Sequence, residues 1–385
     1  MILDFSHDER YYFIKRTVRE FCEKVLGPTA EEVDRAQEFS WDNAKKMGEM
    51  GFWGIQVAPE YGGAGLDTIT YAMIIEEIAR ISASESLSVT VHNSVCAYPI
   101  QRWGTDKQKA KYLPKLASGE HIGCFSLTEP NAGSDVASIE TTAREVEDGY
   151  VLNGNKVFVT NGGVGSTFLI GAMTAKSAGI KGLTIFILEK GMKGFIVGKH
   201  ENKLGMRGSN TSELIMNEVM VPRENVLGQV NGGFKIAMET LNAGRIGIAA
   251  QAVGIGQAAL ELSSSYARKR KQFKRPLTAF QAISFNLADM LTEVEMARLL
   301  VQRAAWKKDN HKPYAKDAAQ CKLVASEVAM KATTKAIQIF GGYGFIKDFP
   351  IERFFRDAKV TEIYEGTSEV MRIIIAQDLI GKLTR

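Results

Sequence analysis

Three carboxylates lie close together in the stretch TEIYEGTSE, residues 361–369. Glu365, the middle one, follows Ile363 and Tyr364 and precedes Gly366, which has no side chain. Apolar neighbours desolvate a carboxylate and raise its pKa, a property that suits a general base working near neutral pH. The spacing alone does not say which reaction such a carboxylate serves.

Uncharged polar groups and glycines are combined in CFSLTEPNAGSD, residues 124–135. Thr128 and Ser134 offer hydroxyl groups, and Gly133 would let the backbone come close to a ligand. A polar β-turn explains the same residues equally well. Ligand binding and turn formation are both consistent with this segment.

Two further segments have the same character. In KVFVTNGG, residues 156–163, Phe158 and Thr160 are two positions apart, so in a strand they face the same side. In QIFGGYGF, residues 338–345, a helical pattern ends in glycines, which suits either close approach to a cofactor or a helix C-cap.

Two other patterns have simpler explanations than their appearance indicates. GIGQAA, residues 254–259, matches a dinucleotide-binding string, but a helical pattern precedes it instead of a strand, so close helix packing is the better interpretation. RKRKQFKR, residues 268–275, has six basic residues in eight. It is consistent with a nucleic-acid or localisation patch, with a solvated helix end, and with a cradle for a pyrophosphate.

The bulk composition excludes several classes of protein. The 385 residues carry a net charge of +4, too small to imply a nucleic-acid partner, and the four cysteines and five histidines are too scattered for a disulfide framework or a metal site. The N-terminal sequence lacks an apolar signal segment, and the longest apolar run is too short to insert in a membrane. We expect an intracellular protein, cytoplasmic in a bacterium or archaeon, or in the mitochondrial matrix as a processed eukaryotic form.

The elements that position these residues change in kind along the chain. Residues 1–121 show helical periodicity, with a capping box predicted at Thr105 and Gln108. Residues 122–230 offer short strand-like runs separated by turns, which predicts an antiparallel β domain. Residues 231–385 return to long helices at roughly 279–309, 315–340 and 367–382, typical of a bundle.

Taken together and in order, these motifs resemble the acyl-CoA dehydrogenase family. The resemblance covers nearly the whole chain and runs through LTEPNAGSD, VTNGG, KLGMRGS, GFKIAMETLNAGRIGIAAQ, RKQF, FQAISFNLADM, QIFGGYGF, RDAK and IYEGTSE. It implies an N-terminal helical domain, a middle antiparallel β-barrel and a C-terminal four-helix bundle. It also implies FAD as cofactor, an acyl-CoA substrate, electron-transferring flavoprotein as electron acceptor, and a homotetramer.

The resemblance assigns Glu365 as the catalytic base. In such enzymes the base removes the α-proton of the thioester, its own backbone N–H and a ribityl hydroxyl of FAD hold the oxyanion, and the β-hydrogen leaves as hydride to flavin N5. The residues matching FAD contacts are Phe125, Leu127, Thr128, Gly133, Ser134, Phe158, Thr160, Arg270, Phe273, Gln281, Gln338, Gly341, Gly342, Thr367 and Glu369. Those matching substrate contacts are Ser134, Asn242, Arg245 and Gly366. Arg270 and Phe273 match residues that complete the FAD site of a neighbouring subunit.

Departures from the family pattern narrow the expected substrate. Phe158 stands where Trp is frequent, and Asn242 stands where Asp is common. Some members carry the base at the position of Gly244, which leaves Glu365 as the candidate here. Dicarboxylic substrates need an arginine near the position of Ser86, and no Arg or Lys occurs between Ile81 and Gln101.

The C-terminal half is most similar to short-chain, butyryl-type members, with branched short-chain members close behind. Two alternatives remain: a flavin oxidase or monooxygenase on the same scaffold, and a non-catalytic binding relative.

Overall fold

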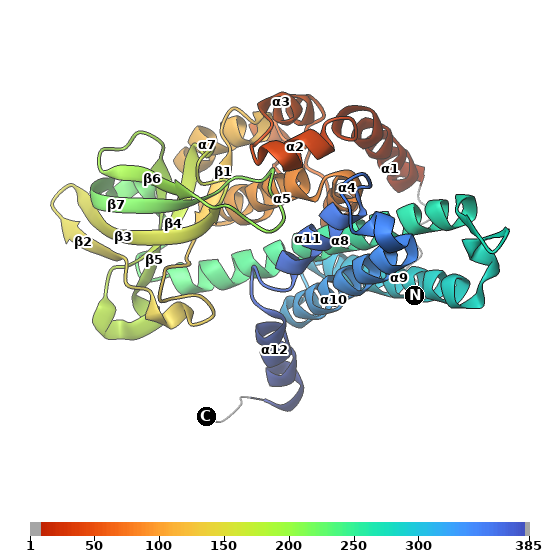
Figure 1. Ribbon diagram of the computed structural model, residues 1–385. Helices are drawn as coiled ribbons and strands as arrows, with labels where there is room; N and C mark the ends of the chain where they lie inside the picture. The colour runs from red at the N-terminus through yellow and green to blue at the C-terminus, as the bar shows by residue number, and fades with distance from the viewer. Residues whose placement is uncertain (1–8, 382–385) are drawn as a thin grey trace.

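The computed structural model describes residues 9–381 and shows three regions along the chain (Figure 1). Most of the N-terminal segment examined for a signal sequence lies outside these residues. The first region is helical, and its α-helices are α1 (Glu9–Phe21), α2 (Ala30–Ala36), α3 (Trp41–Glu49), α4 (Thr68–Ile81), α5 (Ala83–Val91), α6 (Tyr98–Trp103) and α7 (Asp106–Ser118). The predicted capping box at the start of α7 is present: the Gln108 N–H donates to the Thr105 hydroxyl, and the Thr105 N–H donates to the Gln108 side chain.

The middle region is a β domain, but the predicted closed barrel is wrong. Its strands are β1 (Gly123–Ser126), β2 (Thr142–Val146), β3 (Gly149–Thr160), β4 (Thr167–Met173), β5 (Leu183–Glu189), β6 (Phe195–His200), β7 (Thr211–Pro222) and β8 (Val226–Leu227). They form one open sheet in the order β6-β7-β3-β2-β4-β5-β8, with β1 beside β4. Among the described strands, β6 and β8 end the sheet without pairing, and β1 runs parallel to β4, with Gly123 opposite Thr167. Closure depends on pairing between distant strands, which the pattern of short runs and turns does not encode.

The third region contains the long helices, in agreement with the predicted bundle. They are α8 (Gly233–Lys269), α9 (Gln281–Asp309), α10 (Ala315–Phe340), α11 (Ile351–Thr361) and α12 (Ser368–Ile380), and a small hairpin of β9 (Lys271–Gln272) and β10 (Arg275–Pro276) joins α8 to α9. α8 packs against α4, α9, α10 and α11, while α12 projects away from the rest of the molecule (Figure 1). By length and composition α8 could cross a membrane, but 78% of its most apolar window is buried within the protein, as in a core helix.

Glycines in α8 explain the GIGQAA string as helix packing. A Cβ added at Gly254 would lie 2.7 Å from the Cβ of Ala79 on α4, and one at Gly256 would lie 3.1 Å from Cγ2 of Val294 on α9. Close approach of three helices therefore uses the small residues, as predicted.

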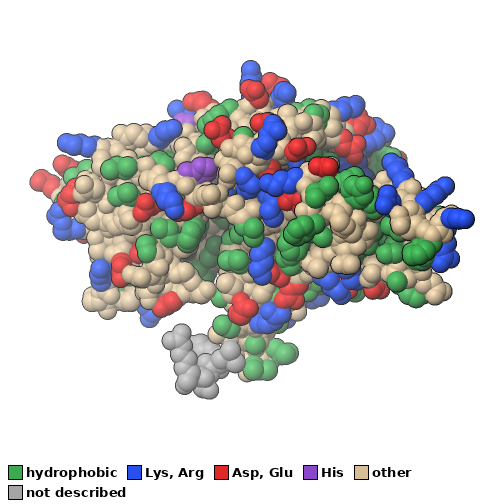
Figure 2. Space-filling model, viewed as in Figure 1, with side chains coloured by type: hydrophobic (Ala, Val, Ile, Leu, Met, Phe, Trp, Pro, Cys, Tyr) green, Lys and Arg blue, Asp and Glu red, His purple; other side chains and the backbone are tan. Residues whose placement is uncertain are grey.

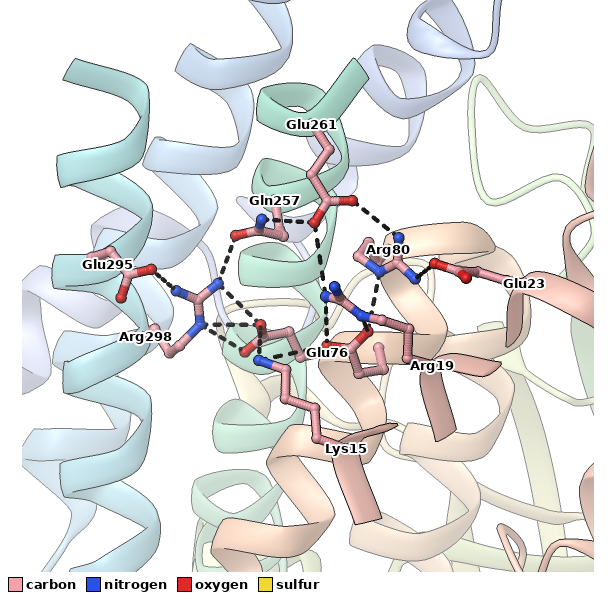
Figure 3. Close-up of polar contacts among 10 residues, drawn as sticks. Lys15, Arg19, Glu23, Glu76, Arg80, Gln257, Glu261, Glu295 and Arg298 are labelled. Atoms are coloured by element: carbon pink, nitrogen blue, oxygen red, sulfur yellow. Dashed lines mark hydrogen bonds and ion pairs between the residues drawn. The ribbon is translucent and has the colours of Figure 1, made fainter. Parts of the chain in front are cut away.

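A group of charged residues ties the N-terminal and C-terminal helices together (Figure 3). We call it the junction network, and it consists of Lys15, Arg19, Glu23, Glu76, Glu77, Arg80, Gln257, Glu261, Glu295 and Arg298. Arg80 on α4 is its centre, with one guanidinium bonded to Glu23, Glu77 and Glu261. Side chains from α1, α4, α8 and α9 are joined in this way.

Candidate active site

Glu365 lies in the tight turn between α11 and α12. The turn begins where the N–H groups of Ile363 and Tyr364 donate to the Val360 carbonyl, and it ends where the Ser368 N–H donates to the Glu362 carbonyl at 3.0 Å. Within it Glu365 has φ 53° and Gly366 has φ 105°, both in the left-handed region. A non-glycine residue is uncommon there, so this backbone holds the carboxylate in an unusual conformation that its surroundings must support.

The carboxylate of Glu365 rests directly on Gly244 of α8. A Cβ added at Gly244 would overlap Oε2 and would lie 2.7 Å from Cδ of Glu365. Any side chain at position 244 would therefore displace the carboxylate. The two positions at which the family is expected to carry its base face each other in space, and in this chain one holds the glutamate and the other leaves room for it.

Charge and burial around Glu365 favour a base that works near neutral pH. Burial raises the pKa of Glu365 to about 7, although Arg245 and Lys322 act to lower it. Its Oε2 is inaccessible and has no hydrogen-bond partner among the described residues. An unpartnered carboxylate oxygen with a raised pKa can accept a proton from a bound ligand.

The predicted substrate residues gather around the same turn. Arg245 Nε donates to the Glu365 carbonyl at 3.1 Å, and its Nη1 donates to Oδ1 of Asn242 at 2.7 Å. A Cβ at Gly366 would lie 2.6 Å from Cε of Met371, so the turn is closely packed there. Arg245, Asn242, Gly366 and Glu365 thus form one site, as the sequence predicted.

Behind the carboxylate, buried polar groups connect the turn to α8 and α5. The Tyr364 hydroxyl donates to Oε1 of Gln251, and Nε2 of Gln251 donates to the Ala83 carbonyl at 2.8 Å. Gln251 is fully buried. Sequence reasoning missed this residue because it is a glutamine in a helical apolar run.

A second group of predicted residues meets at the end of β1 and in the middle of β3. The Val157 N–H donates to the Thr128 carbonyl at 3.0 Å, which brings the two segments side by side. β3 has a bulge between Lys156 and Val159, where Phe158 takes φ 56° and is 65% exposed. An exposed phenyl ring on a strained bulge beside polar Thr128 and Thr160 is a surface suited to stacking against a flat aromatic group such as a flavin.

A buried ion pair supports this surface, and the sequence did not reveal it. Lys156 Nζ donates to Oε1 of Glu129 at 2.7 Å and to the Leu127 carbonyl at 3.0 Å, and Glu129 also accepts the N–H groups of Glu140 and Thr141. Both side chains are almost inaccessible, at 0% and 4%. The pair holds the segment that carries Thr128 against the β3 bulge.

Some predicted contacts are placed less favourably. The Leu127 side chain packs in the core, so only its backbone is available to a ligand. Gly133 and Ser134 are exposed, and an added Cβ at Gly133 would meet nothing within 4 Å. The Thr367 hydroxyl caps α12 by accepting the Val370 N–H, and Glu369 is exposed one turn further on.

The remaining predicted FAD residues lie at the far end of α8. Arg270, Gly341 and Gly342 line a cavity of about 460 Å³ with Tyr266 and Tyr343. Phe273 is 86% exposed at the tip of the β9–β10 hairpin, Gln281 begins α9, and Gln338 is exposed near the end of α10. Figure 2 shows basic side chains projecting at this end of the molecule.

Distance separates this cavity from the catalytic turn. Arg245 and Arg270 are 25 residues apart, and α8 rises about 1.5 Å per residue, so the two arginines are roughly 37 Å apart along the helix. The structure therefore brings the predicted FAD residues together in two groups instead of one within a single chain.

Lys322 is a further residue at the turn that sequence reasoning missed. Its Nζ donates to the Gly366 carbonyl at 2.8 Å, and its side chain is fully buried. The signal was present in the sequence: Ala318, Ala319, Ala325 and Ser326, which share its helix face, are all small and buried. A lysine on an otherwise small-residue face marks a buried cation.

Comparison with known proteins agrees with this arrangement. Family models described as the N-terminal, middle and C-terminal domains of acyl-CoA dehydrogenase match residues 8–120, 124–219 and 231–380. The short-chain-specific acyl-CoA dehydrogenase of Clostridium acetobutylicum is 49% identical over 383 residues, with all of both chains covered.

Solved structures give the same result. The structure of butyryl-CoA dehydrogenase from Megasphaera elsdenii has a TM-score of 0.96 and 45% identity, covering 98% of this chain and 100% of that one. A structure described as electron transferring flavoprotein of Acidaminococcus fermentans contains a chain with a TM-score of 0.97 and 49% identity, with 99% and 100% covered. On these grounds the chain belongs to the acyl-CoA dehydrogenase family, and it is an FAD-dependent oxidoreductase.

Proposed function

We propose that the protein dehydrogenates a short-chain acyl-CoA to the trans-2-enoyl-CoA, with Glu365 as the base that removes the α-proton. The Cα–H electron pair becomes part of the new double bond, and the proton stays on the Glu365 carboxylate. Bound FAD supplies the acceptor for the β-hydrogen, which leaves with its electron pair. The contact between the Glu365 carboxylate and Gly244 carries the proposal, because it fixes the base at the meeting point of α8 and the turn.

The chain's own residues give the base its properties. Burial keeps a large share of Glu365 protonatable near pH 7, while Arg245 and Lys322 keep the carboxylate form accessible. Phe158, Thr128 and Thr160 are the groups that would hold the flavin ring, and Asn242 and Arg245 lie where the substrate would be oriented. Ser134, Thr367 and Glu369 stay proposed contacts.

The relatives support a short acyl chain and a flavoprotein electron acceptor. One relative is specific for short chains, one structural neighbour is a butyryl-CoA dehydrogenase, and another comes from a study of an electron transferring flavoprotein. We therefore propose electron-transferring flavoprotein as the acceptor and a butyryl-type substrate. The bacterial sources of these relatives are consistent with the expected cytoplasmic location, which stays a prediction.

The two separated groups of FAD residues support the proposed homotetramer. Arg270 and Phe273 are roughly 37 Å from Arg245, so within one chain they are far from the flavin ring at Phe158. A second copy of the chain would supply them. The exposed apolar side chains along α9 favour such packing, and they are Phe285, Leu291, Met296 and Leu299.

Replacement of Glu365 tests the proposed function. Glu365→Gln keeps the size of the side chain but removes the base, so flavin reduction on anaerobic mixing with butyryl-CoA is expected to fall by roughly 10²–10⁴-fold. Butyryl-CoA should still bind. Glu362→Gln, three residues earlier in the same segment, is the matched control and should reduce at the wild-type rate. A Glu365→Gln rate above about a tenth of the wild-type rate would place the base elsewhere.

A further inference from the structure

Lys322 is a buried cation without a direct counterion. Its side chain is fully buried on α10, and its Nζ donates to the Gly366 carbonyl at 2.8 Å. Within residues 9–381 no ion pair joins Lys322 to a carboxylate, and the charged groups that act on it are Glu365, Arg245, Glu362 and Glu369. These groups come from α8, from the catalytic turn on both sides of Glu365, and from α12.

A comparison with Lys156 shows how unusual this arrangement is. Lys156 is equally buried, but Glu129 lies 2.7 Å from its ammonium group. Burying an ammonium group is costly unless a charge or several hydrogen bonds compensate, and an apolar side chain of similar volume often serves stability as well or better. Lys322 receives one carbonyl and only indirect charge compensation. Stability alone therefore gives a weak reason for a lysine at this position.

The contact that Lys322 makes is with the catalytic turn itself. Two consecutive residues there, Glu365 and Gly366, have positive φ angles, and each of their carbonyl oxygens accepts a bond from a buried cation. Arg245 holds the first carbonyl from α8, and Lys322 holds the second from α10. Charge-assisted bonds of this kind are stronger than those between neutral groups, so they can maintain a backbone that would otherwise relax.

We propose that Lys322 is a positioning residue for proton abstraction: its ammonium group fixes the Gly366 carbonyl, and its positive charge stabilises the carboxylate form of Glu365. The inference rests on the proposed role of Glu365 as the base. It assigns to α10 a part in catalysis through the turn, without contact between Lys322 and the reacting atoms.

The direction of the electrostatic effect follows from the groups around Glu365. Burial raises the pKa of Glu365 to about 7, and Arg245 and Lys322 oppose that rise. Burial also lowers the pKa of Lys322 to about 8, so Lys322 is charged across the range in which Glu365 ionises. Removing the charge of Lys322 leaves the carboxylate less stabilised, and the pKa of Glu365 rises further. The acidic limb of the pH profile of kcat/KM must then move to higher pH.

The test uses the FAD-loaded protein with butyryl-CoA and an artificial electron acceptor between pH 6 and 9. Lys322→Met removes the charge and the donor. It is expected to move the acidic limb of kcat/KM upward by about one pH unit and to lower kcat at pH 7 at least tenfold. FAD content and Tm should not fall. Lys331→Met, on the exposed side of the same helix where Lys331 pairs with Glu293, is the control and should match the wild-type profile.

Lys322→Gln provides a second variant that keeps a donor without the charge. It should show the same shift of the acidic limb as Lys322→Met, with a smaller loss of kcat above pH 8. An unmoved acidic limb in both variants, or a fall in FAD content and Tm that accounts for the lost rate, would overturn the inference. If Glu365→Gln is inactive while these profiles are unmoved, only the role of Lys322 fails; if Glu365→Gln is active, the proposed function fails first.

Discussion

Carboxylates are buried both in the junction network and at the catalytic turn, but their partners differ. Glu77 in the junction network is 0% exposed, and it accepts bonds from Nε of Arg19 at 2.9 Å and from Nε of Arg80 at 3.0 Å (Figure 3). Glu365 at the turn has cations nearby, but Arg245 and Lys322 donate to backbone carbonyls and leave its Oε2 without a partner.

The partners decide what each carboxylate can do. Burial acts to raise the pKa of Glu77, but bonds and charges from Arg19, Lys15 and Arg80 outweigh it and lower the pKa below its usual value. At Glu365 burial wins, and the pKa rises to about 7. A buried carboxylate surrounded by donors is fixed in its charged form and serves structure, whereas one deprived of direct donors can exchange a proton.

The largest effect on stability is expected at Glu77. Glu77→Gln removes a charge that Arg80, itself only 7% exposed, needs as a partner. Breaking a buried ion pair costs about 3 kcal/mol, so the Tm of the FAD-loaded protein should fall by roughly 5 °C or more. Activity per bound FAD should stay unchanged. Glu23→Gln removes a 52% exposed partner of the same arginine and should cost far less. Equal losses in the two variants would contradict the comparison.

A smaller effect should distinguish the two carboxylates by pH. The lowered pKa of Glu77 contributes stability above its unfolded value of 4.5, and this is lost as pH falls through the lower folded value. The raised pKa of Glu365 has the opposite consequence: ionising it costs stability as pH rises from 4.5 through about 7. Glu365→Gln should therefore raise Tm at pH 8 and lose that advantage toward pH 5, as thermal melts at saturating FAD would show. A gain of equal size at both pH values would argue against a strained, ionisable Glu365.

Local signals in the sequence predicted much of the fold. The strands at 167–173 and 183–189 and the helix at 315–340 agree with the predicted runs, because burial and turn residues mark them locally. The closed barrel was wrong, since the parallel pairing of β1 with β4 joins residues 44 apart, such as Gly123 and Thr167. Periodicity along the chain carries no information on which strands pair.

The catalytic turn and the junction network were predicted unequally. IYEGTSE marked Glu365 through its composition, and the resemblance added Arg245 and Asn242. Partners that come from distant segments were invisible: Arg298 meets Glu76 across 222 residues, and Lys322 meets Gly366 across 44. The sequence shows which residues carry chemistry, whereas the contacts that tune their charge depend on how the helices pack.

The smallest effect is expected at the edge of the junction network. Lys15 is 39% exposed and lies 4.0 Å from Glu76 and 3.6 Å from Glu77, which keep Arg298 and Arg19 as closer partners. An exposed ion pair contributes about 0.5 kcal/mol or less, so Lys15→Met should lower Tm by roughly 1 °C at low salt. Added salt screens such a pair, and the difference from wild type should vanish in 0.5 M salt on the order of the Debye screening length. A loss as large as that of Glu77→Gln, or one insensitive to salt, would mean that the number of charges in the network governs its stability instead of their burial. The contrast with Glu365 would then have to rest on position in the fold alone.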